Sequence, residues 1–253
     1  MIYYHVWDNY PYPSFNKPWY ASNDHIACIS KLTHDIVETV VLDVESSYIP
    51  HAVDEEVFYP LPEASVKQFR QSRGFDDRFV CFWNNRNARR KQSGTLIFWF
   101  KEFLDNVGHD KATLIMHTDP KDIHGQDLEA IIHELGLTEG QVLFSREKVQ
   151  PNDLAMVYNM ADLTINISDA EGFGLATLES LSSGTPILVN KTGGLQDQIS
   201  DGETSFGIGL EPSSKAIIGS QDVPYIYEDR LNKDEFLEAL TALYEMGPEK
   251  RAE

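Results

Sequence analysis

Four positive charges gather within six residues of the segment NNRNARRKQ: Arg86, Arg89, Arg90 and Lys91. This segment directly follows the apolar run RFVCFW, which we expect to be a buried strand. Arginine forks onto phosphate oxygens and lysine acts as a point charge, so side chains of this turn can hold a phosphate. The segment lacks the G-x-G-x-x-G pattern of a dinucleotide-binding turn. A solvated basic loop that offsets acidic neighbours is the alternative.

A second segment, SDAEGFGLATLESLSSGTP, places two carboxylates around a glycine-rich turn. Gly172 and Gly174 bracket the entry into a helix, where exposed amides and the helix dipole favour an anion. Glu171 lies in the turn, and Glu179 lies about 7 Å further along the helix axis. A diphosphate at the helix N-terminus would bring its ribose close to Glu179, which can accept hydrogen bonds from both ribose hydroxyls. Either glutamate alone fits an ordinary surface position, but their joint spacing favours a nucleotide site.

Alternating strands and helices must position these two turns. From about Phe79 the chain repeats short apolar runs and amphipathic segments, with strands expected at RFVCFW, ATLIMHT, QVLFS, DLTINIS and PILVN, and helices at 93–107, DLEAIIHELGL, NDLAMVYNMA and GLATLESLSSG. Such alternation is typical of parallel βαβ crossovers. We therefore predict an α/β fold with a Rossmann-like, doubly wound parallel sheet and helices on both faces. Ligands bind at the carboxyl ends of the strands in such sheets, where both turns lie.

The two ends of the chain depart from this pattern. The first 60 residues are rich in aromatic residues and proline and hold one strand–helix pair, HIACIS and KLTHDIVETV. They are either an extension packed on the main domain or the tail of a second α/β domain. The proline-rich run YIPHAVDEEVFYPLP predicts an ordered linker. At the other end, NKDEFLEALTALYEM predicts a helix with Asn232 as N-cap and Glu235 at N3.

Composition excludes several classes of function. Among the 253 residues, 40 are acidic and 21 basic, and the net charge of −19 argues against binding to nucleic acid or anionic membranes. The two cysteines, Cys28 and Cys81, cannot make a multi-disulfide framework. No apolar run approaches transmembrane length, and the first residues lack the features of a secretory signal. We expect a cytoplasmic protein without a transmembrane segment.

The segment EGFGLATLE resembles the E-x₇-E signature of the retaining family 4 (group 1) glycosyltransferases, which have the GT-B fold. The surrounding run ADLTINISDAEGFGLATLESLSSGTPILVNKTGG is similar to this family without a gap, and YIPHAVDEEVF resembles its I-P-x-G-V-D interdomain segment, with Ala52 in place of glycine. Arg86 and Lys91 match the spacing of the family's diphosphate-binding pair. The resemblance implies three parts: 1–47, the remnant of an N-terminal acceptor domain; 48–75, an interdomain linker; and 76–253, the nucleotide-sugar-binding Rossmann-like domain.

The resemblance also implies a role for each matched residue. Glu179 would bind the nucleotide ribose, and Arg86 and Lys91 would stabilise the leaving diphosphate. Glu171, with the amides of Gly172, Phe173 and Gly174, would hold the transferred sugar, and Leu175 would also belong to the donor-binding residues. No D-x-D triplet occurs in the sequence. Family members of this kind neutralise the leaving group with cations, so we expect neither a metal site nor a cofactor.

The expected activity is hexosyl transfer from a UDP- or GDP-linked sugar to a saccharide or another acceptor, with retention. The chain taken alone is expected to bind donor but transfer little, because most of the acceptor domain is absent from it. The expected protein partner is a second copy in a homodimer or a missing N-terminal half. Other GT-B chemistry, such as nucleotide-sugar epimerisation, and a non-catalytic nucleotide-sugar-binding module are the alternatives. His117 is expected to be structural or to line the cleft. His5 and the aromatic residues near it are expected to pack or to contact an acceptor.

Overall fold

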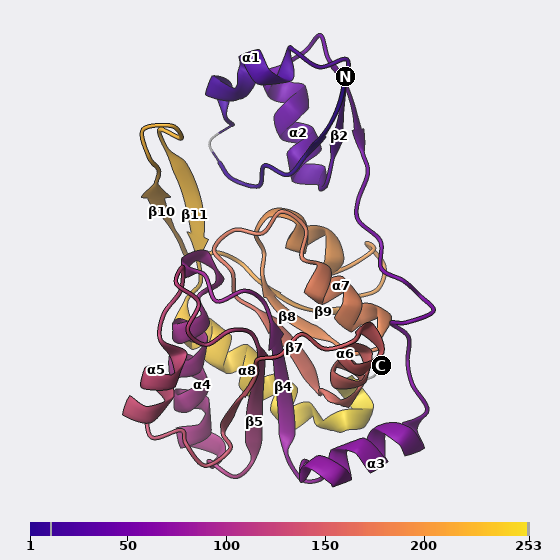
Figure 1. Cartoon of the computed structure of the whole chain (residues 1–253), viewed down its shortest axis with the longest axis vertical. Coiled ribbons are helices and arrows are strands. Elements are labelled where there is room, and N and C mark those ends of the chain that lie inside the picture. The colour runs from indigo at the N-terminus through magenta and orange to yellow at the C-terminus, as the bar shows by residue number, and fades with distance from the viewer. Residues whose placement is uncertain (11, 252–253) are drawn as a thin grey trace.

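A six-stranded, fully parallel sheet forms the centre of the fold in the computed structural model, which describes residues 1–10 and 12–251 (Figure 1). Its strands are β4 (Phe79–Asn84), β5 (Ala112–His117), β6 (Val142–Ser145), β7 (Leu163–Asn166), β8 (Ile187–Asn190) and β9 (Gly207–Leu210). Their spatial order is β6-β5-β4-β7-β8-β9. Starting from β4, strands β5 and β6 extend the sheet in one direction, and β7, β8 and β9 extend it in the other. The predicted doubly wound α/β sheet is therefore confirmed.

This strand order creates a switch point between β4 and β7. The two strands are neighbours in the sheet, with Cys81 opposite Leu163, but their outgoing connections lead to opposite sides. A crevice forms at the carboxyl ends of the strands at such a point, and ligands of open α/β sheets bind there. The turn after β4 carries the basic cluster, and the turn after β7 carries Glu171 and the glycines. The topology thus brings together two turns that lie about 80 residues apart in sequence.

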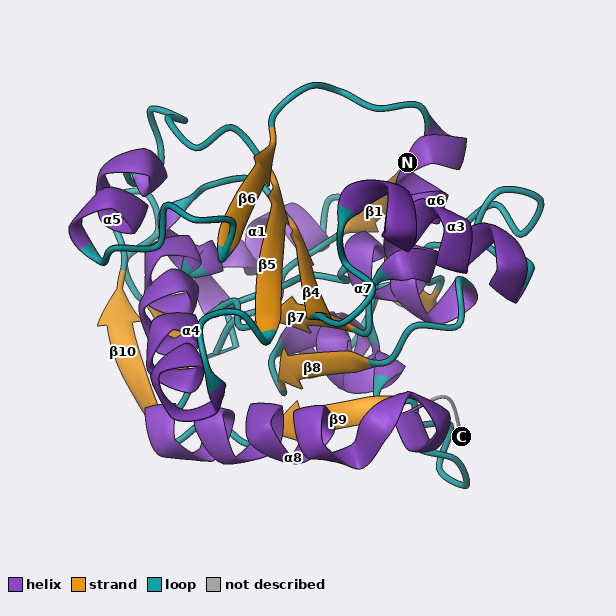
Figure 2. Cartoon of the chain, turned by 90° about the horizontal axis from the view of Figure 1, so that it is seen from below, coloured by secondary structure: helices purple, strands orange, loops and turns teal. Residues whose placement is uncertain are grey.

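Helices cover both faces of the sheet (Figure 2). One face packs on α4 (Ser93–Val107), α5 (Leu128–Glu134) and α8 (Lys233–Arg251). The other packs on α3 (Glu63–Arg73), α6 (Pro151–Met160) and α7 (Leu175–Ser182). Alternate residues of β4 serve the two faces: Cys81 and Trp83 contact the first layer, and Val80 and Phe82 contact the second. Burial on both faces explains why the strand sequences are almost continuously apolar.

Three strands within the N-terminal part of the chain form a small parallel sheet of their own (Figure 1). Strand β2 (His25–Cys28) and helix α2 (Lys31–Val40) are the pair that the sequence predicts, while β1 (Ile2–His5) and β3 (Glu45–Tyr48) flank β2 and were not predicted. The short segments η1 (Ser14–Asn16) and α1 (Lys17–Tyr20) precede β2. A core of five buried side chains holds this part together: Tyr20, Ile26, Cys28, Val37 and Val41.

His5 belongs to this packing. It is 5% exposed, and its Nε2 lies 2.6 Å from the Tyr20 hydroxyl. Burial lowers the pKa of His5 to about 4. The imidazole is therefore neutral at pH 7, and its side chain lies on the opposite side of β1 from Tyr4.

Three further elements lie outside the predicted set. Helix α3 occupies the second half of the segment that we expected to be a linker, and its Val66 and Phe69 pack against the cluster that includes Tyr158 of α6. Strand β9 extends the large sheet beyond β8. Residues 214–230 form an antiparallel hairpin of β10 (Ser214–Ile218) and β11 (Ile226–Arg230), which extends towards the N-terminal part in Figure 1.

Helix α8 begins as the sequence predicts. The Asn232 side chain accepts hydrogen bonds from the amides of Asp234 and Glu235, at 2.7 and 3.3 Å. The helix kinks at Gly247, where φ is 78°, before Pro248. Beyond the kink, Arg251 pairs with Asp162 at 2.8 Å. Across the described ranges, none of the helices combines the length and the apolar character that crossing a bilayer requires.

Candidate functional site

A cavity of about 640 Å³ lies at the switch point. Its walls come from four parts of the chain. The end of β4 and the turn after it contribute Asn84, Asn85, Arg90 and Lys91. The turn after β7 and helix α7 contribute residues 170–176 and Glu179, and strand β11 contributes Ile226 and Glu228. The N-terminal part and the linker contribute Val6, Asp8, Asn9, Ile29 and His51. A polar cavity in this position is the expected ligand site of a doubly wound fold.

The glycine turn at the entry to α7 is rigidly held. Gly174 adopts φ 92°, and a Cβ there would lie 2.6 Å from Leu195 Cδ2, so the position requires glycine. The Gly194 amide donates to Glu171 O at 2.9 Å, and the Gln198 side chain donates to Phe173 O at 2.7 Å. Within the described residues, the backbone amides of 172–176 have no hydrogen-bond acceptor. These amides and the helix dipole make the start of α7 suited to an anion.

Lys91 and Glu171 meet in this cavity although they come from different turns. The Lys91 ammonium forms an ion pair with the Glu171 carboxylate, and Arg90 Nη1 lies 3.8 Å from the same carboxylate. Lys91 is 7% exposed. Burial lowers the pKa of Lys91, while the Glu171 carboxylate acts in the opposite direction. A buried cation beside free helix amides can stabilise negative charge on a bound phosphate.

Arg86 is the predicted site residue that the structure does not bring to the cavity. Its side chain is 60% exposed and forms a two-pronged ion pair with Asp122, at 2.6 and 3.1 Å. This guanidinium holds the pKa of Asp122 at about 2. Arg90 lines the cavity instead, and it donates to the Ala170 carbonyl. The basic turn therefore presents Lys91 and Arg90, rather than Lys91 and Arg86, to the site.

The basic turn is also tied to the hairpin. Arg89 donates to both carboxylate oxygens of Glu228 at 2.7 Å, and Glu228 is 2% exposed. Arg230 pairs with Asp169, whose carboxylate also accepts a hydrogen bond from Gln92. Burial raises the pKa of Asp169 to about 6, against the opposing effects of Gln92 and Arg230. Strand β11 is therefore an integral wall of the cavity.

Glu179 lies where the sequence predicts, on the flank of α7 that faces the cavity. Its carboxylate accepts a hydrogen bond of 2.7 Å from the Tyr158 hydroxyl, which in turn accepts one of 2.9 Å from Asn84. Burial raises the pKa of Glu179, and the bond from Tyr158 opposes this shift. The carboxylate is thus oriented and leaves acceptor capacity for ligand hydroxyls.

Sequence reasoning missed the N-terminal wall of the cavity. Gly172 approaches this wall closely, because a Cβ on Gly172 would lie 3.2 Å from Val6 O. The His51 ring contacts Phe173 edge to face, with centroids 5.2 Å apart. Asp8 also lines the wall, and burial raises its pKa to about 6. No local pattern marks these residues, because only the pairing of β1 with β2 and the course of the linker bring them to the glycine turn.

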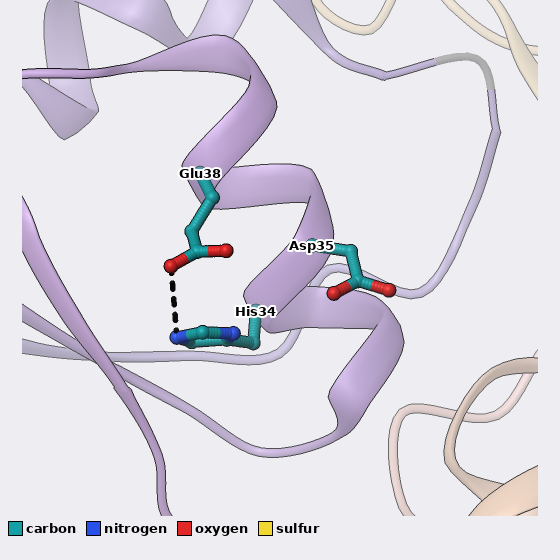
Figure 3. Close-up of side chains that lie close together, drawn as sticks. All are labelled: His34, Asp35 and Glu38. Carbon is teal, nitrogen blue, oxygen red and sulfur yellow. Dashed lines mark ion pairs between the residues drawn. The ribbon is translucent and has the colours of Figure 1, made fainter.

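One group of three potential metal ligands occurs among the described residues, on helix α2. His34 and Glu38 face each other at 3.5 Å, and a carboxylate oxygen of Asp35 lies within 4.8 Å of a potential ligand atom of each (Figure 3). Asp35 and Glu38 are exposed, and the His34–Glu38 contact is an ordinary helical pair at i and i+4. We assign no metal to this group. His117 lies outside the cavity lining, with Nδ1 2.9 Å from Ser145 Oγ.

The chain belongs to the group 1 glycosyltransferases. The family model "Glycosyl transferases group 1" matches residues 67–252. This match covers the large sheet, its helices and both turns of the cavity.

Two curated relatives illustrate the range of this family. Mannosylfructose-phosphate synthase from Agrobacterium fabrum is 32% identical over 175 residues, which cover 68% of this chain and 37% of the relative. Alpha-monoglucosyldiacylglycerol synthase from Streptococcus pneumoniae is 26% identical over 181 residues, covering 70% of this chain and 40% of the relative. The chain thus spans about two fifths of the length of these relatives.

Solved structures share the fold at low sequence identity. Sucrose-phosphate synthase from Thermosynechococcus elongatus superposes with a TM-score of 0.73 at 20% identity, covering 94% of this chain and 53% of that protein. Anabaena Alr3699/HepE, solved in complex with UDP and glucose, gives a TM-score of 0.71 at 16% identity, covering 99% and 63%. Both superpositions agree with the predicted GT-B type of α/β fold.

Proposed function

We propose that the chain is the donor-binding part of a retaining glycosyltransferase that transfers a hexosyl group from a UDP- or GDP-linked sugar to a saccharide or another acceptor. The observation that carries this proposal is the cavity at the β4–β7 switch point. There, unpaired helix amides, the buried Lys91 and the oriented Glu179 converge within one site. Family membership and the UDP and glucose of the Anabaena relative support the same class of ligand.

The ligand would lie along helix α7. Its diphosphate would be held by the amides of 172–176 and by Lys91, and Glu179 would accept hydrogen bonds from the ribose hydroxyls. Glu171 would contact the transferred sugar after releasing Lys91 to the diphosphate. Lys91, with Arg90 or with an Arg86 released from Asp122, would stabilise the charge that grows on the leaving diphosphate. This role needs side-chain cations only, so we propose no metal.

The test is isothermal calorimetry of the full chain with UDP, GDP, ADP and the corresponding bare nucleosides. We expect UDP or GDP to bind, and we expect the diphosphate to contribute most of the affinity. Binding of none of these nucleotides would overturn the proposal. Product analysis with the preferred nucleotide sugar then separates transfer from epimerisation, because only a transferase links the sugar to an acceptor or to water.

A further inference from the structure

A second carboxylate lies beside Glu171 in the cavity, and it comes from the N-terminal part. Asp8 lies after β1, and its side chain lies close to Gly193, in the segment that follows β8. A Cβ on Gly193 would lie 2.0 Å from Glu171 O and 3.2 Å from Asp8 Cβ. Glycine at this position therefore allows the Asp8 side chain to approach the backbone of Glu171 closely. Both side chains line the same cavity.

Asp8 differs from the other carboxylates of the cavity in having no hydrogen-bond or ion-pair partner among the residues that the structure describes. Glu171 is paired with Lys91, Glu179 with Tyr158, and Glu228 with Arg89. Across residues 1–10 and 12–251, no other residue donates a hydrogen bond to the Asp8 carboxylate. Arg90 and Lys91, the cations nearest to it, contact Ala170 and Glu171 instead. Its hydrogen-bonding capacity therefore faces the cavity.

The backbone around Asp8 is fixed by side chains on both sides of it. Thr33 Oγ1 donates to Trp7 O at 2.8 Å, and the Trp7 indole donates to Asn9 O at 2.8 Å. Asn9 Nδ2 donates to Tyr227 O of strand β11 at 2.9 Å. Asp8 is thus held in place before any ligand arrives, as a residue that selects a ligand group should be.

We propose that Asp8 is a specificity-determining residue that accepts a hydrogen bond from a hydroxyl group of the transferred sugar. This inference rests on the proposed function, in which Glu171 contacts the same sugar. A carboxylate accepts hydrogen bonds and repels phosphate, so among the parts of a nucleotide sugar it suits the sugar hydroxyls and not the diphosphate. Asp8 and Glu171 line the same cavity, and Asp8 lies near the Glu171 backbone at Gly193, so a sugar bound there is within reach of both.

The test compares two ligands on the full chain by calorimetry: a nucleoside diphosphate and its glucose- or mannose-linked form. Asp8→Ala should leave the affinity for the nucleoside diphosphate unchanged or slightly increased, and lower the affinity for the nucleotide sugar about 10-fold or more. Asp8→Asn, which keeps one oxygen acceptor, should give a smaller loss. Asp43→Asn is the matched control, because Asp43 is exposed and outside the cavity.

Two results would overturn the inference, and they have different meanings. If the nucleoside diphosphate binds normally and the ratio of the two affinities is the same in wild type and Asp8→Ala, Asp8 does not contact the sugar, while the proposed function stands. If neither ligand binds wild type, the proposed function and this inference both fail. A thermal unfolding curve for each variant shows whether it is folded. If Asp8→Ala does not fold, the two affinities are compared in the more conservative variant Asp8→Asn.

Discussion

Arg89 of the basic turn and Glu228 of strand β11 form a two-pronged ion pair, with both N–O distances at 2.7 Å. Glu228 is buried, whereas the Arg89 side chain is 57% exposed. The pair fixes the turn that carries Lys91 against the hairpin. Arg89 therefore has a structural role within the basic turn, and it does not line the cavity.

Arg89→Ala should lower the free energy of unfolding by about 1–3 kcal/mol, because the buried Glu228 carboxylate would keep only Arg230, at 3.2 Å. Urea unfolding followed by circular dichroism measures the change. Arg86→Ala is the control: its partner Asp122 is more exposed than Glu228, so loss of that pair should change the free energy of unfolding less. Equal losses in the two variants would show that the Arg89–Glu228 pair has no special structural role.

Glu179→Ala should weaken nucleoside diphosphate binding about 10- to 100-fold, because two charge-assisted hydrogen bonds to the ribose would be lost. Tyr158→Phe should weaken the same binding by a smaller factor, since it removes only the 2.7 Å bond that orients Glu179. Calorimetry measures both variants. A 2′-deoxyribose nucleotide is the matched probe: it should bind wild type more weakly, yet lose less affinity on Glu179→Ala. An unchanged Kd in folded Glu179→Ala would rule out the ribose contact.

The fold could be predicted from sequence where burial dictates the pattern. Strands β4, β5, β7 and β8 are buried on both faces and read as apolar runs, and helix α4 has the predicted bounds, Ser93–Val107. Strand β3 could not be found this way, because ESSY has no apolar pattern and is a strand only through its pairing with β2. Helix α3 has no buried residue, and its few apolar side chains only partly pack. Its sequence therefore carries a weak amphipathic signal.

The candidate site divides in the same manner. Lys91, Glu171, Glu179 and the glycine turn are found by local spacing, because one strand end and one helix start position each of them. Asp8 and His51 enter the cavity through contacts between distant parts of the chain, which no local spacing encodes. The choice between Arg86 and Arg90 depends on Asp122, a residue of the loop after β5. The composition of the basic turn indicates phosphate binding, but it does not tell which cations line the cavity.

Variants of the basic turn test that choice. Lys91→Ala and Arg90→Ala should each weaken nucleoside diphosphate binding by about 10-fold or more, and affect the bare nucleoside far less, because these cations would contact only phosphate. Arg86→Ala should cause a smaller loss if Arg86 stays with Asp122. A loss as large as that of Lys91→Ala would mean that Arg86 leaves Asp122 when the donor binds. Equal losses for nucleotide and nucleoside in all three variants would exclude a phosphate-specific role.

The raised pKa of Asp8 makes a prediction about stability. Burial is the main cause of its shift from 3.8 to about 6, Arg90 and Lys91 oppose it, and Glu171 adds to it. The folded state therefore binds this proton more tightly than the unfolded state, so the stability due to Asp8 is greatest below about pH 4 and falls as the pH rises through about 6. Asp8→Asn removes the cost of the buried charge. It should stabilise the chain by about 1–2 kcal/mol at pH 7.5, after allowance for residual solvent contact, and by almost nothing at pH 4.

Urea unfolding of Asp8→Asn and wild type at pH 4 and pH 7.5 measures this difference, with Asp43→Asn as the control that should show none. If Asp8→Asn raises the stability of the chain and also lowers its affinity for the nucleotide sugar, Asp8 shows the trade-off between stability and binding that is common at binding sites. If Asp8→Asn is less stable than wild type at pH 7.5, the carboxylate has a partner in the folded protein that stabilises its charge. In that case, Asp8 would support the fold around Gly193, and its capacity to bind a sugar hydroxyl would be correspondingly smaller.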